Sequence, residues 1–345
     1  MLSSLAQRVI LAKIRAMFGR RISPKDYSAV MNALTVPDIA AYLKGDTQFR
    51  DTLAHINPVT IHRGQLENLL RRDYFSRYVR LLKYDKDNDF YRYVMTDNEI
   101  AQIIMMIRLI NSGSADQYIL SLPTFLAEHS EIDLMKFTTV KSFGDLLEIL
   151  KASPYYKVLK DCVPDASGEM NLIDCERKLR TYYFETIFGL IGSHYFGKAR
   201  QSLTEYFKME VDMVNLSILY RIKQSFAYDP SFFDASLLKI EGYIPPKKLE
   251  QMAESPDLAA LQKIILTTRY DKIFASNPNG TVEDVAERIR LAFVKKNIHT
   301  SIITPVVMVS YVAFCNIELA NLIKIIEGVR YQIGPQEISK LIITD

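Results

Sequence analysis

One pattern occurs three times along this chain, roughly once every 110 residues. In each copy an acidic residue stands three positions before an amide residue, and an apolar run follows the amide. Residues three apart share one face of a helix, so each acid and its amide point in the same direction. A helical unit used three times predicts a scaffold with internal pseudo-symmetry, which binds partners rather than catalyses. The three pairs are Glu99 with Gln102, Asp212 with Asn215, and Glu318 with Asn321.

A second helix-like segment precedes each acid by about 35 residues, so the repeating unit contains more than one helix. The copies at 67–75 and 176–184 match well, because both read Glu, then Leu-Arg, then an aromatic pair. The third copy, near Glu283, matches poorly.

A third element shows how the two ends of the chain relate. The segment 37–41 recurs as 256–260, and an aromatic residue, Phe49 or Tyr270, follows each copy about a dozen residues later. A weaker middle copy runs from 140 to 156. The chain therefore begins with the second half of a unit and ends with the first half of one. We expect its two ends to pack together and complete one of three lobes.

The sequence predicts an all-α fold. Glycine is scarce, with 13 residues, and long stretches carry apolar residues at spacings of three and four. No alternation typical of a β-strand extends beyond four residues. We expect three similar helical lobes in a pseudo-threefold funnel. The first combines 1–60 with 300–345, the second spans 61–165 and the third spans 166–299.

Charge and cysteine content exclude several classes of protein. Lys and Arg total 43 against 40 Asp and Glu, and this net charge of +3 is too balanced to favour nucleic acid as a partner. The three cysteines, Cys162, Cys175 and Cys315, are too few and too scattered for a disulfide framework or a zinc site. We expect free thiols in a reducing compartment, although Cys162 and Cys175 could approach each other.

No segment predicts a signal peptide or a membrane span. Arg8 interrupts the apolar stretch near the start, which we expect to continue as an amphipathic helix. The most membrane-like segment, 298–315, contains polar residues and Pro305, and it is too interrupted for a span of about 20 apolar residues. We expect a buried pair of helices with a break at Pro305.

Two motifs resemble ligand loops but lack residues that those loops need. Gly192, Gly197 and Lys198 have the spacing of a phosphate-binding loop, but Ala199 stands where a magnesium-binding hydroxyl belongs. We expect a tight connection between two helices there. The segment 85–90 resembles the start of a calcium loop without its glycine and glutamate, and we interpret it as a solvated turn. The five histidines show no paired spacing for a metal.

The acid–amide pairs themselves allow two interpretations. They could make polar contacts that orient a partner, or they could be structural contacts at helix starts, where a carboxylate favours the positive helix end and caps free amides. Repetition at equivalent positions favours the structural interpretation, because a catalytic site is normally present once per chain. We therefore predict no catalytic residue, no cofactor site and no metal site.

Four segments of the chain, taken in their order, carry a resemblance to a known family. They are Asp212-x-x-Asn215-Leu216 with Arg221-x-Lys223, the run from Glu318 through Asn321 to Gly328, the ending Ile333-x-Pro335-x-x-Ile338, and 12–17 near the start. They resemble the C subunit of the V/A-type rotary ATPases, the relative of the d subunit of eukaryotic V-ATPases. The resemblance covers nearly the whole chain, and the order of the segments carries it more than any one of them.

The resemblance implies a non-catalytic adapter. In that family a funnel of three helical lobes sits on the cytoplasmic end of the membrane proteolipid ring, as a peripheral protein, and receives the central stalk, which the D and F subunits form. It couples rotation of the stalk to the ring for ion transport or ATP synthesis, without an active site or small-molecule substrate. Two alternatives remain open: an all-helical repeat scaffold for protein binding unrelated to rotary ATPases, and a nucleotide-hydrolysing protein centred on Lys198.

Overall fold

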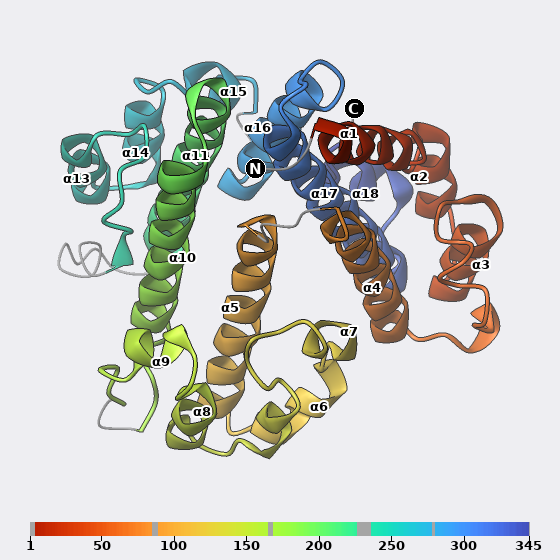
Figure 1. Cartoon of the computed structure of the whole chain (residues 1–345), viewed down its shortest axis with the longest axis horizontal. Coiled ribbons are helices and arrows are strands. Elements are labelled where there is room, and N and C mark those ends of the chain that lie inside the picture. Colours follow the sequence, from red (N-terminus) through yellow and green to blue (C-terminus); the bar gives the residue numbers. More distant parts are fainter. Residues whose placement is uncertain (1–3, 85–88, 165–167, 226–235, 278–279, 345) are drawn as a thin grey trace. The chain divides into compact units, whose positions relative to one another are not determined.

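The computed structural model describes the 345-residue chain apart from residues 1–3, 85–88, 165–167, 226–235, 278–279 and 345 (Figure 1). The part of the chain so described consists of α-helices, short 3-10 helices and their connections, with no β-strand. This confirms the all-α prediction. The chain divides into two compact units. Unit 1 comprises Met1–Asn88 and Glu287–Asp345, and unit 2 comprises Asp89–Ala286.

Unit 1 is built around one long helix, α17, against which α1, α2, α3, α4 and α18 pack. Apolar residues cover most of the circumference of α17, so it is buried on nearly all sides. Leu291 of the preceding helix, α16, joins Ile317 of α17 and Ile343 in one apolar cluster. The helices are α1 (Ser4–Gly19), α2 (Pro24–Met31), α3 (Val36–Asp46), η1 (Pro58–Thr60), α4 (Arg63–Leu82), α16 (Val282–Ile298, which begins in unit 2), α17 (Thr304–Arg330) and α18 (Pro335–Leu341).

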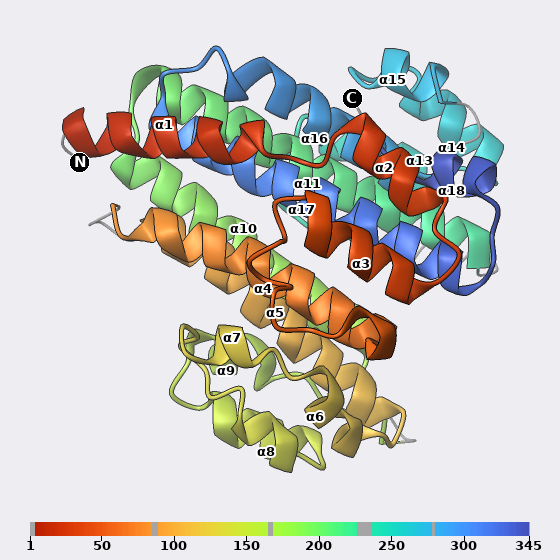
Figure 2. The ribbon, with the colours of Figure 1, turned by 90° about the vertical axis from the view of Figure 1, so that its right-hand side faces the viewer.

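The two ends of the chain pack together within unit 1, as the order of the repeats predicts. Figure 2 shows α1 running alongside α17, and Arg15 of α1 donates hydrogen bonds to the carbonyl oxygens of Ile298 and Ser301, at 3.2 and 2.8 Å. Helix α4, which the sequence division assigns to 61–165, also packs along α17. The three-lobe funnel and its boundaries stay a prediction.

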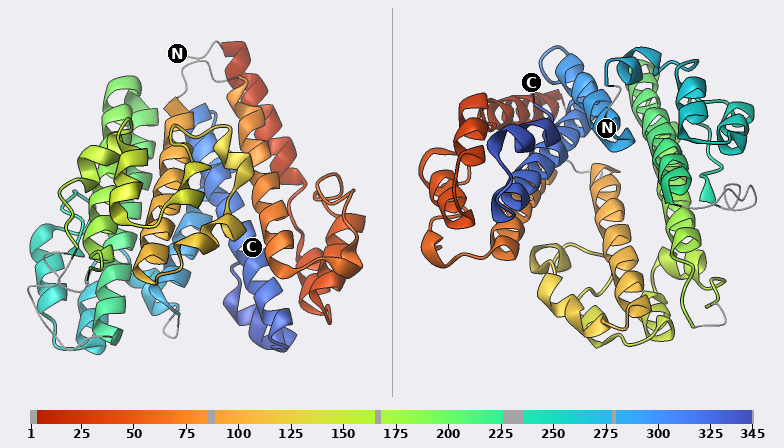
Figure 3. Two further views of the ribbon diagram at one scale, coloured as in Figure 1. Left: turned by 90° about the horizontal axis from the view of Figure 1, so that it is seen from below. Right: turned by 180° about the vertical axis from the view of Figure 1, so that it is seen from behind.

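The described residues of unit 2 include three long helices, with α10 packed against both α5 and α11 (Figures 1 and 3). Short helices fill the connections: α8 and α9 pack on each other, as do α13 and α14. The helices are α5 (Asp89–Asn111), η2 (Ala115–Gln117), α6 (Tyr118–Ser121), α7 (Thr124–Ala127), η3 (Lys136–Thr139), α8 (Phe143–Leu150), α9 (Pro154–Leu159), α10 (Leu172–His194), α11 (Gly197–Ser225), α13 (Pro246–Glu254), α14 (Leu258–Ile265) and α15 (Asp271–Ala275).

Several short helices begin with a capping box, which explains why they form despite their length. In α3 the Thr35 hydroxyl accepts from the Asp38 backbone N–H, and the Asp38 carboxylate accepts from the Thr35 N–H at 2.9 Å. Ser23 with Asp26 starts α2 in the same way, and α8 has the same arrangement. Each box satisfies two backbone donors that a helix start otherwise leaves unpaired.

Candidate functional site

The three repeated acids are almost fully buried, and each lies well inside a long helix. The exposed fractions are 2% for Glu99, 0% for Asp212 and 1% for Glu318. Glu99 is in α5, Asp212 in α11 and Glu318 in α17. The prediction that they sit at helix starts is wrong, because a full turn or more of helix precedes each of them. Their own helices supply no free backbone donors there, so their partners come from other segments.

Each buried carboxylate accepts a hydrogen bond from one tyrosine hydroxyl, with an oxygen–oxygen distance of 2.6 Å in all three copies. A hydroxyl donating to a carboxylate makes a short, strong bond in an apolar interior. Burial raises the pKa of each of these tyrosines, and the neighbouring acid raises it further, so the hydroxyl remains a donor. The pairs are Tyr155 with Glu99, Tyr270 with Asp212, and Tyr74 with Glu318.

Each acid also accepts from the backbone of a loop that packs on its helix. Asp212 takes the N–H groups of Tyr243 and Ile244, at 2.9 and 3.1 Å. Glu318 takes that of Ile22 and Glu99 that of Glu131, at 2.6 and 2.7 Å. A carboxylate buried without an ion pair needs several such donors. Each acid therefore fastens a loop to its helix.

Glycine is required where the loop approaches Asp212. A Cβ atom added to Gly242 would lie 2.0 Å from Asp212 Oδ1. No other residue type can bring the backbone this close to the carboxylate. Burial raises the pKa of Asp212 above its ordinary value, and its bonds from Tyr270, Ile244 and Tyr243 act in the opposite direction. Burial raises the pKa of Glu318 in the same manner.

The repeated amides fasten the chain in two of the three copies. The Asn321 side chain both donates to the Ile343 carbonyl, at 2.7 Å, and accepts from its N–H, at 2.9 Å. Asn215 makes the same pair of bonds with Leu238, at 3.3 and 2.8 Å. Gln102 instead accepts from the Tyr118 hydroxyl at 2.9 Å. The two asparagines and all three acids are too deeply buried to orient a partner, which favours the structural interpretation, whereas Gln102 is half-buried.

In two of the three copies the aromatic residue that recurs with the repeat is the hydroxyl donor to the buried acid, and in the third copy another residue replaces it. The aligned aromatics in unit 2, Tyr155 and Tyr270, are the hydroxyl donors to their acids. In unit 1 the aligned residue is Phe49, which has no hydroxyl, and Tyr74 of α4 supplies it to Glu318. The Phe49 ring packs edge-on against Tyr74, with 5.7 Å between ring centroids. The repeat therefore predicts an aromatic residue near Glu318 correctly, but the residue that donates the hydrogen bond is Tyr74 and not Phe49.

The glycine–lysine motif joins two helices, as the sequence predicts. Helix α10 ends at His194 and α11 begins at Gly197, so only two residues separate them. Gly197 has φ of +55°, a conformation that favours glycine and allows the tight reversal. A phosphate-binding loop follows a strand, whereas a helix precedes this one. The segment therefore lacks the strand–loop–helix geometry on which the nucleotide-hydrolysing interpretation centred on Lys198 depends. The calcium-like segment 85–90 lies mostly outside the described residues.

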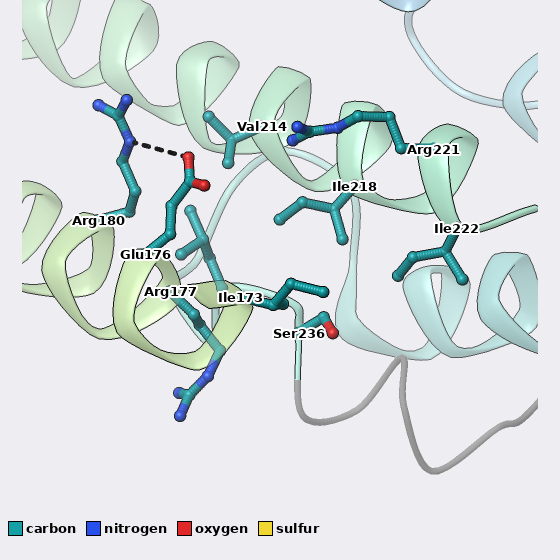
Figure 4. Close-up of a pocket in the computed structure, with 10 residues that line it drawn as sticks. Ile173, Glu176, Arg177, Arg180, Val214, Ile218, Arg221, Ile222 and Ser236 are labelled. Carbon is teal, nitrogen blue, oxygen red and sulfur yellow. Dashed lines mark ion pairs between the residues drawn. The ribbon is translucent and has the colours of Figure 1, made fainter. Parts of the chain in front are cut away.

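Unit 2 also contains a pocket between α10 and α11, with a volume of about 310 Å³. Its surface is mainly apolar, and arginine side chains surround it, as Figure 4 shows. The lining residues are Ile173, Glu176, Arg177 and Arg180 of α10, Val214, Ile218, Arg221 and Ile222 of α11, and Ser236 and Leu238.

Ion pairs hold two of the pocket arginines in place. Arg180 Nη1 lies 2.7 Å from Asp97 of α5, and its Nε lies 4.0 Å from Glu176. Arg177 lies 2.6 Å from Asp174 on its own helix. Burial opposes the charge of Arg180, but Asp97 and Glu176 outweigh it and raise its pKa. Two of the three arginines in the lining are therefore paired with carboxylates, and the third is Arg221 of α11.

A family model described as the ATP synthase (C/AC39) subunit matches residues 10–341. The chain belongs to this family. It is 24% identical over 272 residues to the C subunit of the A-type ATP synthase of Methanosphaera stadtmanae, and the match covers 77% of this chain and 67% of the relative. It is 23% identical over 327 residues to the same protein of Methanosarcina acetivorans, covering 92% and 87%. The chain is therefore a subunit of a membrane-associated rotary ATPase of the ATP synthase type.

Two of the segments that carried the resemblance meet in unit 1 of this ATP synthase (C/AC39) subunit. A Cβ atom added to Gly328 of α17 would lie 2.6 Å from Ile338 Cγ1 of α18. Gly328 therefore lets α18 fold back against α17, and Ile338 is fully buried there. The glycine and the isoleucine belong to one packing contact.

Within the described ranges, α17 is the one helix of this protein with the length and composition to cross a membrane. Its most apolar window is 72% buried inside the protein, which is typical of a core helix. Helix α16 ends at Ile298, and α17 begins at Thr304 with Pro305 in its first turn. The predicted break between two helices exists, but it lies before Pro305, which stands in the first turn of α17, and α17 is the buried helix of the two.

Proposed function

We propose that this protein is a non-catalytic adapter of the central stalk, at the cytoplasmic face of the membrane. It links the rotating stalk, formed by the D and F subunits, to the membrane proteolipid ring, and so couples ATP hydrolysis or synthesis to ion transport. The family match over residues 10–341 carries this proposal, because the matched relatives are named as C subunits of A-type ATP synthases. The same match argues against the alternative of a helical scaffold unrelated to rotary ATPases.

The construction of the two units supports a role in transmitting force. Long helices such as α11 and α17, of 29 and 27 residues, resist bending when they are packed along their length. Deeply buried acids fasten the intervening loops to these helices with several hydrogen bonds each. An adapter under torque needs this rigidity, and it needs distributed contacts rather than a reactive centre.

The pocket between α10 and α11 is our candidate contact for the stalk. The end of a helical stalk presents apolar side chains together with carbonyl groups that carry partial negative charge. The pocket offers an apolar floor, from residues such as Ile218 and Ile222, with guanidinium groups around it. Arg221 is exposed and accessible to a partner.

Binding experiments test the adapter role directly. The purified chain should bind a stalk complex of the D and F subunits and should co-sediment with membranes that contain the proteolipid ring. It should not hydrolyse ATP by itself. An enzyme complex assembled without the chain should hydrolyse ATP in its catalytic head but should not pump ions. A chain that binds neither stalk nor ring, or that hydrolyses ATP alone, would refute the proposal.

A charge reversal in the pocket tests the candidate contact separately. Arg221→Glu should weaken stalk binding by about tenfold or more, because it places like charge against the stalk carbonyls and carboxylates. The matched control is Lys151→Glu, at an exposed site elsewhere in unit 2, which should bind the stalk normally. Equal stalk binding by both variants would show that the pocket is not the contact, while the adapter role would still rest on the other measurements.

A further inference from the structure

Two of the three cysteines lie against each other in unit 2. Cys162 follows α9, and Cys175 is in the first turns of α10. Both are free thiols with exposed fractions of only 8% and 1%. Lys178 of α10 reaches the Cys162 sulfur at 3.2 Å, and Cys175 lies three residues before Lys178 on the same face of that helix, which brings the two cysteines together. The third cysteine, Cys315, is a free thiol buried in unit 1.

A charged lysine holds the pair. Lys178 Nζ donates to Cys162 Sγ at 3.2 Å, and an ion pair of 2.9 Å with Asp174 Oδ2 fixes the same nitrogen. Asp174 and Lys178 are one helical turn apart, so α10 itself sets this geometry. The ammonium group, the Cys162 sulfur and the Cys175 thiol thus form one contiguous cluster.

These contacts favour the thiolate at Cys162 and the thiol at Cys175. Hydrogen bonds from Cys175 and Lys178 lower the pKa of Cys162 to about 6, against the effect of burial. The pKa of Cys175 moves in the opposite direction, because it donates to Cys162 and is buried. The pKa of Lys178 is raised, since its bonds to Asp174 and Cys162 outweigh burial, so it stays charged. A thiolate beside a protonated thiol is the arrangement of an attacking and a resolving cysteine.

We propose that Cys162 and Cys175 form an oxidation site in which a peroxide converts the two thiols into a disulfide. The Cys162 thiolate attacks a peroxide oxygen; the O–O bond breaks, hydroxide leaves and Cys162 becomes a sulfenic acid. The Cys175 sulfur then attacks the Cys162 sulfur, its proton leaves with the sulfenic hydroxyl as water, and the S–S bond forms. The two electrons lost by the thiols reduce the peroxide, and the product ties the end of α9 to α10.

Mass spectrometry of the intact reduced chain tests this site. The protein is treated with one equivalent of hydrogen peroxide at pH 7, alkylated after denaturation and digested after glutamate without reduction. Cleavage at Glu169 separates the two cysteines, so a disulfide appears as one cross-linked pair of peptides. We expect this pair, with Cys315 still fully alkylated. Cys315 is the internal control, because burial raises its pKa to about 12.

Two variants test the chemistry of the cluster. Cys175→Ser keeps a hydroxyl donor but cannot resolve, so a sulfenic acid at Cys162 should accumulate and react with dimedone. Lys178→Met should slow alkylation of Cys162 at pH 7 by about tenfold, since the thiolate fraction falls as its pKa returns towards about 8.5. The matched control is Lys160→Met, an exposed lysine two residues before Cys162, which should leave the rate unchanged.

The outcomes separate cleanly. Oxidation of Cys315 at the same rate as Cys162, no cross-linked peptides at one equivalent of peroxide, or equal alkylation rates in Lys178→Met and Lys160→Met would each overturn the site. The wild-type digest alone decides whether the disulfide forms, so the test does not depend on the folding of any variant.

Discussion

Replacing Asp212 tests whether the buried acids hold the fold together. Asp212→Ala removes the acceptor of three hydrogen bonds, from the Tyr270 hydroxyl and the backbone N–H groups of Tyr243 and Ile244. Asp212 has zero exposure, so little water can reach these donors when their acceptor is removed. A buried donor left unsatisfied costs about 1–3 kcal/mol. With three such donors, Asp212→Ala should lower the free energy of unfolding by at least about 3 kcal/mol.

The assay is thermal unfolding of unit 2. For a domain of this size each kcal/mol shifts the melting temperature by roughly 2–4 °C, so Asp212→Ala should lower it by roughly 6–12 °C. The matched control is Glu148→Ala, which removes an exposed carboxylate paired with Lys151 and should cost no more than about 0.5 kcal/mol. A shift for Asp212→Ala no larger than that of the control would refute the reasoning.

Thermal unfolding at different pH values tests a second property of Asp212, the pH dependence of its contribution to stability. Burial raises its pKa in the folded state, so the folded protein holds the proton more tightly than the unfolded chain. The stability from this group is fully present below the unfolded value of about 4 and is lost as pH rises through the raised folded value. Asp212→Asn removes this titration, so the gap between wild type and Asp212→Asn should be larger at pH 4 than at pH 7.

Three further substitutions test other contacts by thermal unfolding. Gly328→Ala should cost about 1–3 kcal/mol, because its new methyl group overlaps Ile338, and the double variant with Ile338→Ala should recover part of it. Arg77→Met should cost about 3–5 kcal/mol by leaving the buried Asp73 carboxylate without its ion pair, whereas replacing both partners should cost less. Tyr74→Phe should cost about 1–3 kcal/mol through its lost hydroxyl bond to a buried carboxylate, and a loss below about 0.5 kcal/mol would contradict that role.

The fold class and the repeat were predictable from sequence because both are local patterns. Helical spacing depends on residues within a few turns of each other, and the acid–amide pairs are only three residues apart. The way in which the repeated helices pair with one another could not be predicted in this way. The spacing of the repeats does not show which helix of one copy packs against which helix of another. For example, α4 packs against α17, although the two helices lie near opposite ends of the chain. Only tertiary contacts reveal that pairing.

The pocket and the thiol cluster could not be predicted in the same way. Arg180 and Arg221 come together from two helices, and each looks like an ordinary solvated cation in the sequence. Cys162 and Cys175 could be suspected of proximity, but the role of Lys178 depends on its hydrogen bond to sulfur. Distances between side chains on different elements carry this information, and a linear pattern does not contain it.

The exchange of donors at Glu318 shows what the repeat preserves. In two copies the hydroxyl comes from the aligned aromatic, Tyr155 or Tyr270, but in unit 1 the aligned residue is Phe49 and the hydroxyl comes from Tyr74. A buried carboxylate needs a donor, and the geometry of a helix packed beside it allows more than one element to provide one. Each repeated unit thus keeps a buried carboxylate that requires hydrogen-bond donors, while the residue that supplies the hydroxyl can change. For this reason the acids are the part of the repeat that is easiest to recognise in the sequence.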